Sequence, residues 1–308
     1  MTIREWLEAC HLHPDPETYL AHGYLDLCLR AWPSAKGQPL RLAAQWAVWT
    51  WLVDDSFDAD DPAISDVTPV LVGAVDDEPL PADTHPLAVA LGDLCSKTRA
   101  IMPGWWWGRF REALGVWLAT AEAKLLSYLR PGRTPSLAEY LRLRPDDGGM
   151  QLAAMWCEVA NLCVTLDWRD PLVQELVAAF SACGILLNDL AAAPGDTFTA
   201  VQALVHAEAM SIEQARAEVE QLLAAEERRF AVRLWAARAQ SVGLAGGSVL
   251  EGEVREDTAQ FARALDQFRR ALAEWTRESS RYVWAAPADD GRVDGGRARA
   301  TILAPTRT

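Results

Sequence analysis

The segment "WTWLVDDSFDADD", residues 49–61, runs from two tryptophans directly into five aspartates. A helix ends with unpaired carbonyl groups and a partial negative charge, so carboxylates gathered at its C-terminus are repelled unless a cation joins them. Two interpretations follow. The segment is either a solvated acidic loop or a group of carboxylates that holds a cation.

Helical periodicity dominates the chain on both sides of this segment. Apolar residues recur at intervals of three and four, as in Ile212, Ala215 and Val219, while alternating strand patterns with hairpin turns are missing. We therefore predict an all-α, single-domain protein over residues 1–284. The expected helical regions are 16–32, 38–56, 86–102, 105–129, 136–165, 171–193, 198–208, 211–242 and 250–284.

Two segments are expected to lack regular structure. Residues 58–85, rich in Asp and Pro, are predicted to form a long surface loop, and residues 285–308 a disordered tail.

Composition narrows the class of protein. With 308 residues, 50% of them hydrophobic, the chain can bury a large core. Its net charge of -14, without a basic stripe, argues against nucleic-acid binding. Six cysteines without a C-x-x-C pair and a first segment without a signal-peptide core indicate a cytoplasmic protein. The apolar runs Leu42–Val53 and Leu176–Leu187 are shorter than the roughly 18 residues of a membrane span, so none is expected.

The aspartates have the spacing of a metal site. Asp54 and Asp58 are four residues apart and share a helix face, and Asp55 lies about 100° around the axis. Three carboxylates at one helix end suit Mg²⁺, a hard cation that takes oxygen ligands.

A second oxygen-rich segment could complete such a site. In "NDLAAAPGD", residues 188–196, Asn188, Ala192 and Asp196 are spaced to share one helix face. An ordinary helix end with a Pro-Gly break is the alternative interpretation.

Positive charge occurs near two helix ends, at Arg144 and at the pair Arg281 and Tyr282. Arginine binds phosphate oxygens in a bidentate manner, and a tyrosine hydroxyl adds a neutral donor. Taken alone, an arginine at such a position is more often part of a surface salt bridge.

Taken together, these stretches resemble the bacterial class I terpene synthases (terpene cyclases), in order from His13 and Pro14 to Arg281 and Tyr282. The D-D-x-x-D motif is matched in full by Asp54, Asp55 and Asp58. The second metal motif of the family, N-D-x-x-S-x-x-x-E, is matched by Asn188, Asp189 and, with a shorter side chain, Asp196, whereas Ala192 replaces its serine.

The resemblance also implies roles for the segment around Arg144. This arginine falls where the family places its diphosphate-sensing arginine, with Asp147 and Gly148 at the linker and effector positions, where "DDGG" is expected to break a helix. The implied catalytic residues are thus Arg144, Asp147 and Gly148, and the implied diphosphate ligands are Arg144, Arg281 and Tyr282. Three Mg²⁺ ions belong to the family pattern, and the lost hydroxyl at Ala192 is expected to weaken one.

The implied fold is an α-helical bundle around a central apolar cavity, and the implied reaction is loss of diphosphate from a prenyl chain followed by carbocation cyclisation. A desolvated cation is stabilised over an indole ring. Trp51, one turn before Asp54, is expected to line the cavity as a catalytic residue, and Trp156 and Trp275 are weaker candidates for cavity aromatics.

Several alternatives stay open. The substrate could be farnesyl (C15) or geranylgeranyl (C20) diphosphate, and the chain could be a monomer or a homodimer. A chain-elongating prenyltransferase normally carries two D-D-x-x-D motifs, of which this sequence has one. A degenerate, non-catalytic protein that binds prenyl diphosphate is the third interpretation, because the second metal motif is damaged.

Overall fold

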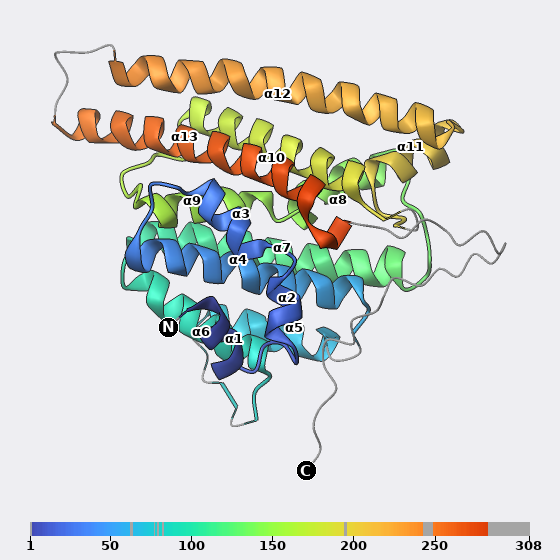
Figure 1. The fold of residues 1–308 in the computed structure, drawn as a ribbon, viewed down its shortest axis with the longest axis horizontal. Helices are drawn as coiled ribbons and strands as arrows, with labels where there is room; N and C mark the ends of the chain where they lie inside the picture. Colours follow the sequence, from blue (N-terminus) through green and yellow to red (C-terminus); the bar gives the residue numbers. More distant parts are fainter. Residues whose placement is uncertain are drawn as a thin grey trace.

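The computed structural model describes residues 2–61, 64–76, 78, 80–81, 83–193, 196–242 and 249–282, and all regular elements in these ranges are helical (Figure 1), which confirms the all-α class. The first helices are α1 (Ile3–Ala9), α2 (Pro16–Leu20), α3 (Tyr24–Ala31), α4 (Gly37–Asp58), α5 (Ile64–Val75), α6 (Pro86–Arg99) and α7 (Gly104–Lys124). A π-helical turn, η1 (Leu125–Leu129), continues α7. The others are α8 (Leu137–Asp147), α9 (Met150–Asn161), α10 (Pro171–Ala191), α11 (Ala200–Glu208), α12 (Ile212–Val242), α13 (Val249–Glu278) and the 3₁₀ turn η2 (Ser280–Tyr282).

The helices form stacked layers with α4 near the middle. The long antiparallel pair α12 and α13 covers α10 along one side of the molecule (Figure 1). Helix α4 packs against α9, α3, α6 and α7, and α5 and α6 pack against each other on the far side. The element that carries the aspartates is therefore an internal helix.

Large tryptophans hold α4 in place. Trp46 and Trp49 are completely buried. The indole N–H of Trp46 donates to the Thr98 hydroxyl at 2.8 Å, and that of Trp49 donates to the Leu87 carbonyl at 2.9 Å. Satisfied indole N–H groups let these side chains bury their full apolar area without an orphaned donor, so α4 is joined firmly to α6.

A Schellman motif ends α4 directly after the aspartates. Asp60 adopts a left-handed conformation with φ 50°, and its N–H donates to the Phe57 carbonyl at 3.1 Å, while the Asp61 N–H donates to the Ser56 carbonyl at 3.0 Å. The Asp60 side chain accepts from Arg130 Nε at 2.8 Å. The direction in which α4 ends is thus fixed by backbone hydrogen bonds and by an ion pair to Arg130, the residue that follows η1.

The predicted loop over residues 58–85 is wrong in its middle part, which forms α5. The sequence of α5 places Ile64, Val67 and Leu71 at helical spacing, and all three are buried. Packing of this apolar face against α6 outweighs the propensity of Pro69 and of the flanking aspartates and prolines for turns.

Two further boundaries differ from the expected ranges. The region 16–32 divides into α2 and α3 at Gly23, whose φ of 83° interrupts the helix. The region 136–165 divides into α8 and α9 at Gly148 and Gly149, where Gly149 has φ 63°, as the "DDGG" segment predicts.

Helix α1 was not expected; it begins with a capping box between Thr2 and Glu5. The tail 285–308 and the last expected helical residues, 283–284, lie outside the described residues.

Of the described helices, α10 alone is long and apolar enough, by length and composition, to cross a membrane. This helix, Pro171–Ala191, is longer than the apolar run Leu176–Leu187 on which the expectation of no membrane span was based. In the fold α10 packs against α9, α12 and α13, and Val173, Leu176 and Phe180 on it are completely buried. Its apolar character is therefore that of a helix in a protein core.

A buried ion pair joins α7 to α9 inside the bundle. Arg109 Nη2 lies 2.7 Å from both carboxylate oxygens of Glu158, whose side chain is completely buried. Trp168 donates its indole N–H to the same carboxylate at 3.0 Å, and the Arg109 guanidinium lies 4.2 Å from a Trp168 ring centre. The Glu158 carboxylate is thus well hydrogen-bonded, as a buried carboxylate requires, whereas Nε of Arg109 is buried without a hydrogen-bond partner among the described residues.

We predict that Arg109→Met lowers the free energy of unfolding by about 3–5 kcal/mol, because it leaves the Glu158 carboxylate buried without its partner. The matched control is Arg111→Met on the same helix, which removes a largely exposed ion pair with Asp76 and is expected to cost about 0–1 kcal/mol. Urea unfolding followed by circular dichroism measures both. Equal losses for the two variants would contradict the prediction, whereas partial recovery in the double variant with Glu158→Gln would support it.

Candidate active site

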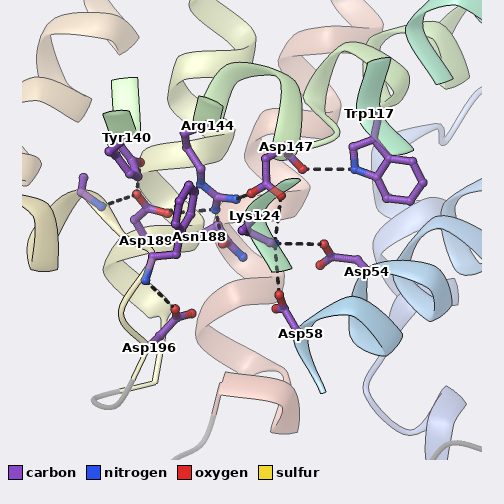
Figure 2. A network of polar contacts seen from close by, with 12 residues as sticks. Asp54, Asp58, Trp117, Lys124, Tyr140, Arg144, Asp147, Asn188, Asp189 and Asp196 are labelled. Atoms are coloured by element: carbon purple, nitrogen blue, oxygen red, sulfur yellow. Dashed lines mark hydrogen bonds and ion pairs between the residues drawn. The ribbon is translucent and has the colours of Figure 1, made fainter. Parts of the chain in front are cut away.

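The C-terminal ends of four helices meet at one end of the bundle. Figure 2 shows the end of α4 facing the ends of α8 and α10, with Lys124 from the end of α7 between them. Most of the predicted polar site residues lie on these helix ends, namely Asp54, Asp55, Asp58, Arg144, Asp147 and Asn188. Arg281 and Tyr282 follow α13 in η2, and Asp196 lies in the loop after α10. The two acidic segments that the sequence analysis singled out therefore face a shared centre.

Protein cations occupy the aspartate-rich motif. Lys124 Nζ lies 3.1 Å from Asp58 and 3.8 Å from Asp54, so two carboxylates converge on one ammonium group. Asp55 points to a different partner, Arg281, with contacts of 2.6 and 2.9 Å. Arg281 also donates to the Tyr24 hydroxyl at 2.9 Å. The predicted difference in direction between Asp54 and Asp55 is thus present.

The second motif is held by an arginine and a tyrosine. The side-chain oxygen of Asn188 accepts from Arg144 Nη2 at 2.7 Å, and its amide nitrogen donates to the Tyr282 hydroxyl at 3.0 Å. Next to it, Asp189 is buried and accepts from Arg144 Nη2 at 2.9 Å. Asn188 therefore faces the site, whereas Asp189 anchors Arg144.

Asp189 also ties three helices together. Its second oxygen accepts from the Tyr140 hydroxyl of α8 and from the Ala200 backbone N–H at the start of α11, the latter at 2.7 Å. A carboxylate at the N-terminus of a helix is favoured by the unpaired N–H groups there. Asp189 is therefore engaged by the protein itself.

The predicted placement of Asp196 on the helix of Asn188 is wrong. Helix α10 ends at Ala191, and Ala192 already has an extended ψ of 154°, so Asn188, Ala192 and Asp196 do not share one helix face. Asp196 lies in the following loop, where its side chain accepts from the Phe198 backbone N–H at 3.1 Å, an Asx turn. The Pro-Gly break that follows Ala193 accounts for the early end of the helix.

Arg144 is the central cation on the α8 side of the site. Besides Asn188 and Asp189 it contacts Asp147, with Nη1 2.7 Å from Oδ2. The Asp147 carbonyl accepts from the Trp117 indole N–H at 3.1 Å. Arg144 and Asp147, the implied sensor and linker residues, thus lie in direct contact, as Figure 2 shows.

Gly148 closely approaches α10. A Cβ atom at this position would lie 2.8 Å from Cγ1 of Ile185 and 3.1 Å from the Arg144 carbonyl oxygen. Because real Cβ atoms essentially never approach another atom to 2.8 Å, a side chain at this position would require the Ile185 side chain or the adjoining backbone of α8 to shift. The glycine is required by close packing at the position where the resemblance places the effector residue.

The tryptophans predicted to line a cavity, Trp51, Trp156 and Trp275, form one aromatic cluster next to the charged residues. Trp51 stacks on Tyr24 with ring centres 4.9 Å apart, and it lies 5.4 Å from Trp275 and 6.3 Å from Trp156. Trp275 makes an edge contact with Tyr282 at 5.3 Å. Trp51 is partly buried while Trp156 and Trp275 are almost completely buried. The three indoles thus lie together, and their role in lining a cavity stays a prediction.

Like charges in this confined space shift the protonation of Asp54. Burial, and secondly the neighbouring Asp58 carboxylate, raise the pKa of Asp54 to about 7, although Lys124 acts in the opposite direction. For Lys124, burial alone would lower the pKa, but Asp147, Asp58 and Asp54 together raise it above its usual range. The ammonium group therefore stays charged at neutral pH.

The donor set fits a divalent metal on one side of the site. Carboxylate oxygens are the ligands that Mg²⁺ prefers, and Asp54 and Asp58 already converge on one cationic group. Within the described ranges, no group of three or more His, Cys, Asp or Glu side chains is arranged to hold a metal ion. For Asn188 to bind a metal through its side-chain oxygen, Arg144 would have to release it.

Four residues of this network are not among those predicted from the sequence, namely Lys124, Tyr140, Tyr24 and Trp117. Lys124 is one of three lysines in the chain and stands near the end of a predicted apolar helix, which is a usable signal. Tyr24 and Tyr140 give none, because a tyrosine near a helix end is ordinary in the core or at its edge.

Comparison with known proteins identifies the family. The family model described as terpene synthase family 2, C-terminal metal binding, matches residues 45–229. Over 170 residues the chain is 29% identical to a sesquiterpene synthase of Metarhizium guizhouense, an alignment that covers 53% of this chain and 49% of that protein. It is 26% identical over 283 residues to the pristinol synthase of Streptomyces pristinaespiralis, covering 87% of this chain and 74% of that one. The chain thus spans about half the length of the fungal relative.

A solved structure shares the fold. The crystal structure of linalool/nerolidol synthase from Streptomyces clavuligerus in complex with 2-fluorogeranyl diphosphate matches with a TM-score of 0.78 at 21% identity, covering 89% of this chain and 96% of that chain. The family model covers more than half of the 308 residues and includes both acidic motifs and Arg144. The chain therefore belongs to the class I terpene synthases, within terpene synthase family 2, as the resemblance of its motifs implied.

Proposed function

We propose that this protein is a terpene cyclase that ionises a linear prenyl diphosphate with the help of Mg²⁺ and cyclises the resulting carbocation. The observation that carries the proposal is that the carboxylates Asp54 and Asp58 face Arg144 and Asn188 across one site. An aromatic cluster lies next to this site. A diphosphate needs positive charge and a prenyl chain needs an apolar surface, and here the two lie side by side.

The cationic side chains of the chain would bind the leaving group. Arg144 and Arg281 are mostly buried, with 11% and 19% of their side chains exposed, so their charges are poorly screened by solvent. Burial raises the pKa of the Tyr282 hydroxyl, which keeps it neutral and able to donate a hydrogen bond. Bound Mg²⁺ supplies Lewis-acid stabilisation of negative charge on the departing diphosphate.

The aromatic cluster would protect and guide the cation. Trp51 lies one turn before Asp54 on α4. With the diphosphate held at the aspartates, its indole would be close to the prenyl carbon that becomes positively charged when the diphosphate leaves. A cation over an indole is stabilised by about 0.5–2 kcal/mol, more when water is excluded. Trp156 and Trp275 extend this surface on α9 and α13.

For the substrate, farnesyl diphosphate is the first candidate and geranylgeranyl diphosphate the second. The sesquiterpene synthase name of the fungal relative supports a C15 chain. The bulky tryptophans Trp51, Trp156 and Trp275 also favour a shorter chain, since they take up volume near the charged end.

The direct test offers the protein C10, C15, C20 and C25 prenyl diphosphates with Mg²⁺, with and without isopentenyl diphosphate. Cyclic products in the gas chromatography–mass spectrometry trace, together with released inorganic diphosphate, support a cyclase. Longer linear diphosphates formed only with isopentenyl diphosphate indicate a prenyltransferase. Binding without turnover of any substrate indicates a degenerate binding protein.

Arg144→Met is predicted to lower kcat by about 10²–10³-fold, because it removes a preorganised positive charge from the leaving group. The matched control is Arg142→Met, an exposed arginine on the same helix, for which kcat is expected to stay unchanged. Steady-state release of diphosphate measures both variants, and circular dichroism checks that Arg144→Met is folded. Equal kcat values for the two variants would reject the proposed role.

Metal affinity is predicted to fall as the pH drops through 7. Asp54 has a pKa of about 7 without metal, so below that pH a proton competes with the divalent cation for its oxygens. Calorimetry with Mg²⁺ alone is expected to give roughly tenfold weaker binding at pH 6 than at pH 8. In Asp54→Asn this pH dependence should disappear. An affinity in the wild-type protein that is independent of pH over this range would contradict the prediction.

Ala192→Ser is predicted to lower the concentration of Mg²⁺ needed for half-maximal turnover, because it adds the hydroxyl ligand of the family motif at a position directly after α10, three residues beyond Asp189. Ala193→Ser, one residue further along the loop, is the matched control and is expected to have no effect. The test is to measure the turnover of both variants and of the wild type over a range of Mg²⁺ concentrations. An unchanged Mg²⁺ dependence in Ala192→Ser would show that the lost hydroxyl does not weaken the site.

A further inference from the structure

Lys124 is a buried cation at the centre of the site. It is the last residue of α7, and only 5% of its side chain is exposed. Its ammonium group lies 2.9 Å from Asp147, 3.1 Å from Asp58 and 3.8 Å from Asp54 (Figure 2). One lysine thus joins the aspartate-rich motif of α4 to the end of α8.

Because Lys124 is buried, its charge depends on the carboxylates around it. A buried ammonium group is stable only when carboxylates or other acceptors replace its hydration, and three carboxylates do so here. Conversely, the Asp54 and Asp58 carboxylates, which both face the Lys124 ammonium group, would repel each other without a positive charge between them. Lys124 and the two aspartates therefore stabilise one another in the metal-free protein.

The other cations of the site do not share this position. Arg281 contacts Asp55, and Arg144 contacts Asp147 and Asp189. Among the ion pairs of the described residues, Lys124 is the cation that contacts both Asp54 and Asp58, the two carboxylates that share a face of α4. A divalent cation that uses these two oxygens as ligands must take the place of the ammonium group or approach it closely.

We propose that Lys124 is the resident counter-ion of the aspartate-rich motif, and that a divalent cation binds Asp54 and Asp58 in competition with its ammonium group. The inference rests on the proposed function only in taking these aspartates as metal ligands. When metal binds, Lys124 keeps Asp147 as its partner. Because Asp147 also contacts Arg144, metal at α4 then changes the charge balance around the arginine on α8.

The chain is well suited to a direct test, because it contains only three lysines, Lys36, Lys97 and Lys124. In protein with isotope-labelled lysine side chains, each ε-CH₂–NH₃⁺ group gives a separate nuclear magnetic resonance signal. Titration of the full chain with Mg²⁺ alone is expected to shift the Lys124 signal and to leave the Lys36 and Lys97 signals in place. Assignment comes from the substituted proteins.

Lys124→Met is the informative variant, since it keeps the length of the side chain and removes the charge. We expect the Kd for Mg²⁺, measured by calorimetry at pH 8 without substrate, to fall by about tenfold, within the range found for coupled sites. The melting temperature without metal should be lower than in the wild type, and the gain on adding Mg²⁺ larger. Lys124→Arg keeps the charge and should bind Mg²⁺ as the wild type does.

Lys97→Met is the matched control. Lys97 is also a helical lysine paired with an aspartate, Asp93, but it is partly exposed and lies beside Gln45, near the other end of α4. From Gln45 to Asp54 the helix rises by roughly 14 Å. The control variant should leave the Kd for Mg²⁺ unchanged.

Several outcomes would overturn the inference. A Lys124 signal that does not move at saturating Mg²⁺, a Kd in Lys124→Met equal to or weaker than that of the wild type, or no Mg²⁺ binding by either protein each excludes competition. The nuclear magnetic resonance titration uses the wild-type chain, so it decides even if Lys124→Met does not fold. A chain that shows the competition but converts no prenyl diphosphate would refute the proposed function and leave this inference standing.

Discussion

Negative charge at helix C-termini is the constraint on which this site depends. Helices α4, α8 and α10 all bring carboxylates to one end of the bundle, where the carbonyl groups of each helix already carry a partial negative charge. Such an arrangement is stable only if cations enter it. Lys124, Arg144 and Arg281 do so, and each contacts at least one carboxylate at 2.6–2.9 Å.

The cations also connect the two halves of the site. A chain of contacts runs from Asp58 through Lys124, Asp147 and Arg144 to Asn188. A second one runs from Asp55 to Arg281, and the neighbouring Tyr282 contacts Asn188. A ligand that carries both metal ions and diphosphate would exchange partners along these chains. If the proposed ligands bind here, we expect binding at one half of the site to change the charge balance at the other half.

The aromatic layer depends on the same helix positions. Trp51 projects from α4 one turn before the aspartates, and Tyr24, Trp156 and Trp275 surround it from α3, α9 and α13. Because α4 is fixed by buried tryptophans and its end by a Schellman motif, the relative position of the apolar and charged parts is set by a rigid element. This is the form of support that a preorganised site needs.

The sequence by itself determined the helical class and the faces of α4 on which Asp54, Asp55, Asp58 and Trp51 lie, because a helix has a fixed period. It did not reveal α5, where burial overrides turn-forming residues, nor the end of α10 before Asp196. Only the tertiary structure decided which cation neutralises which carboxylate, and hence that Lys124 stands among Asp54, Asp58 and Asp147. Spacing along one helix is local, whereas a contact between α4, α7 and α8 depends on how the whole bundle packs.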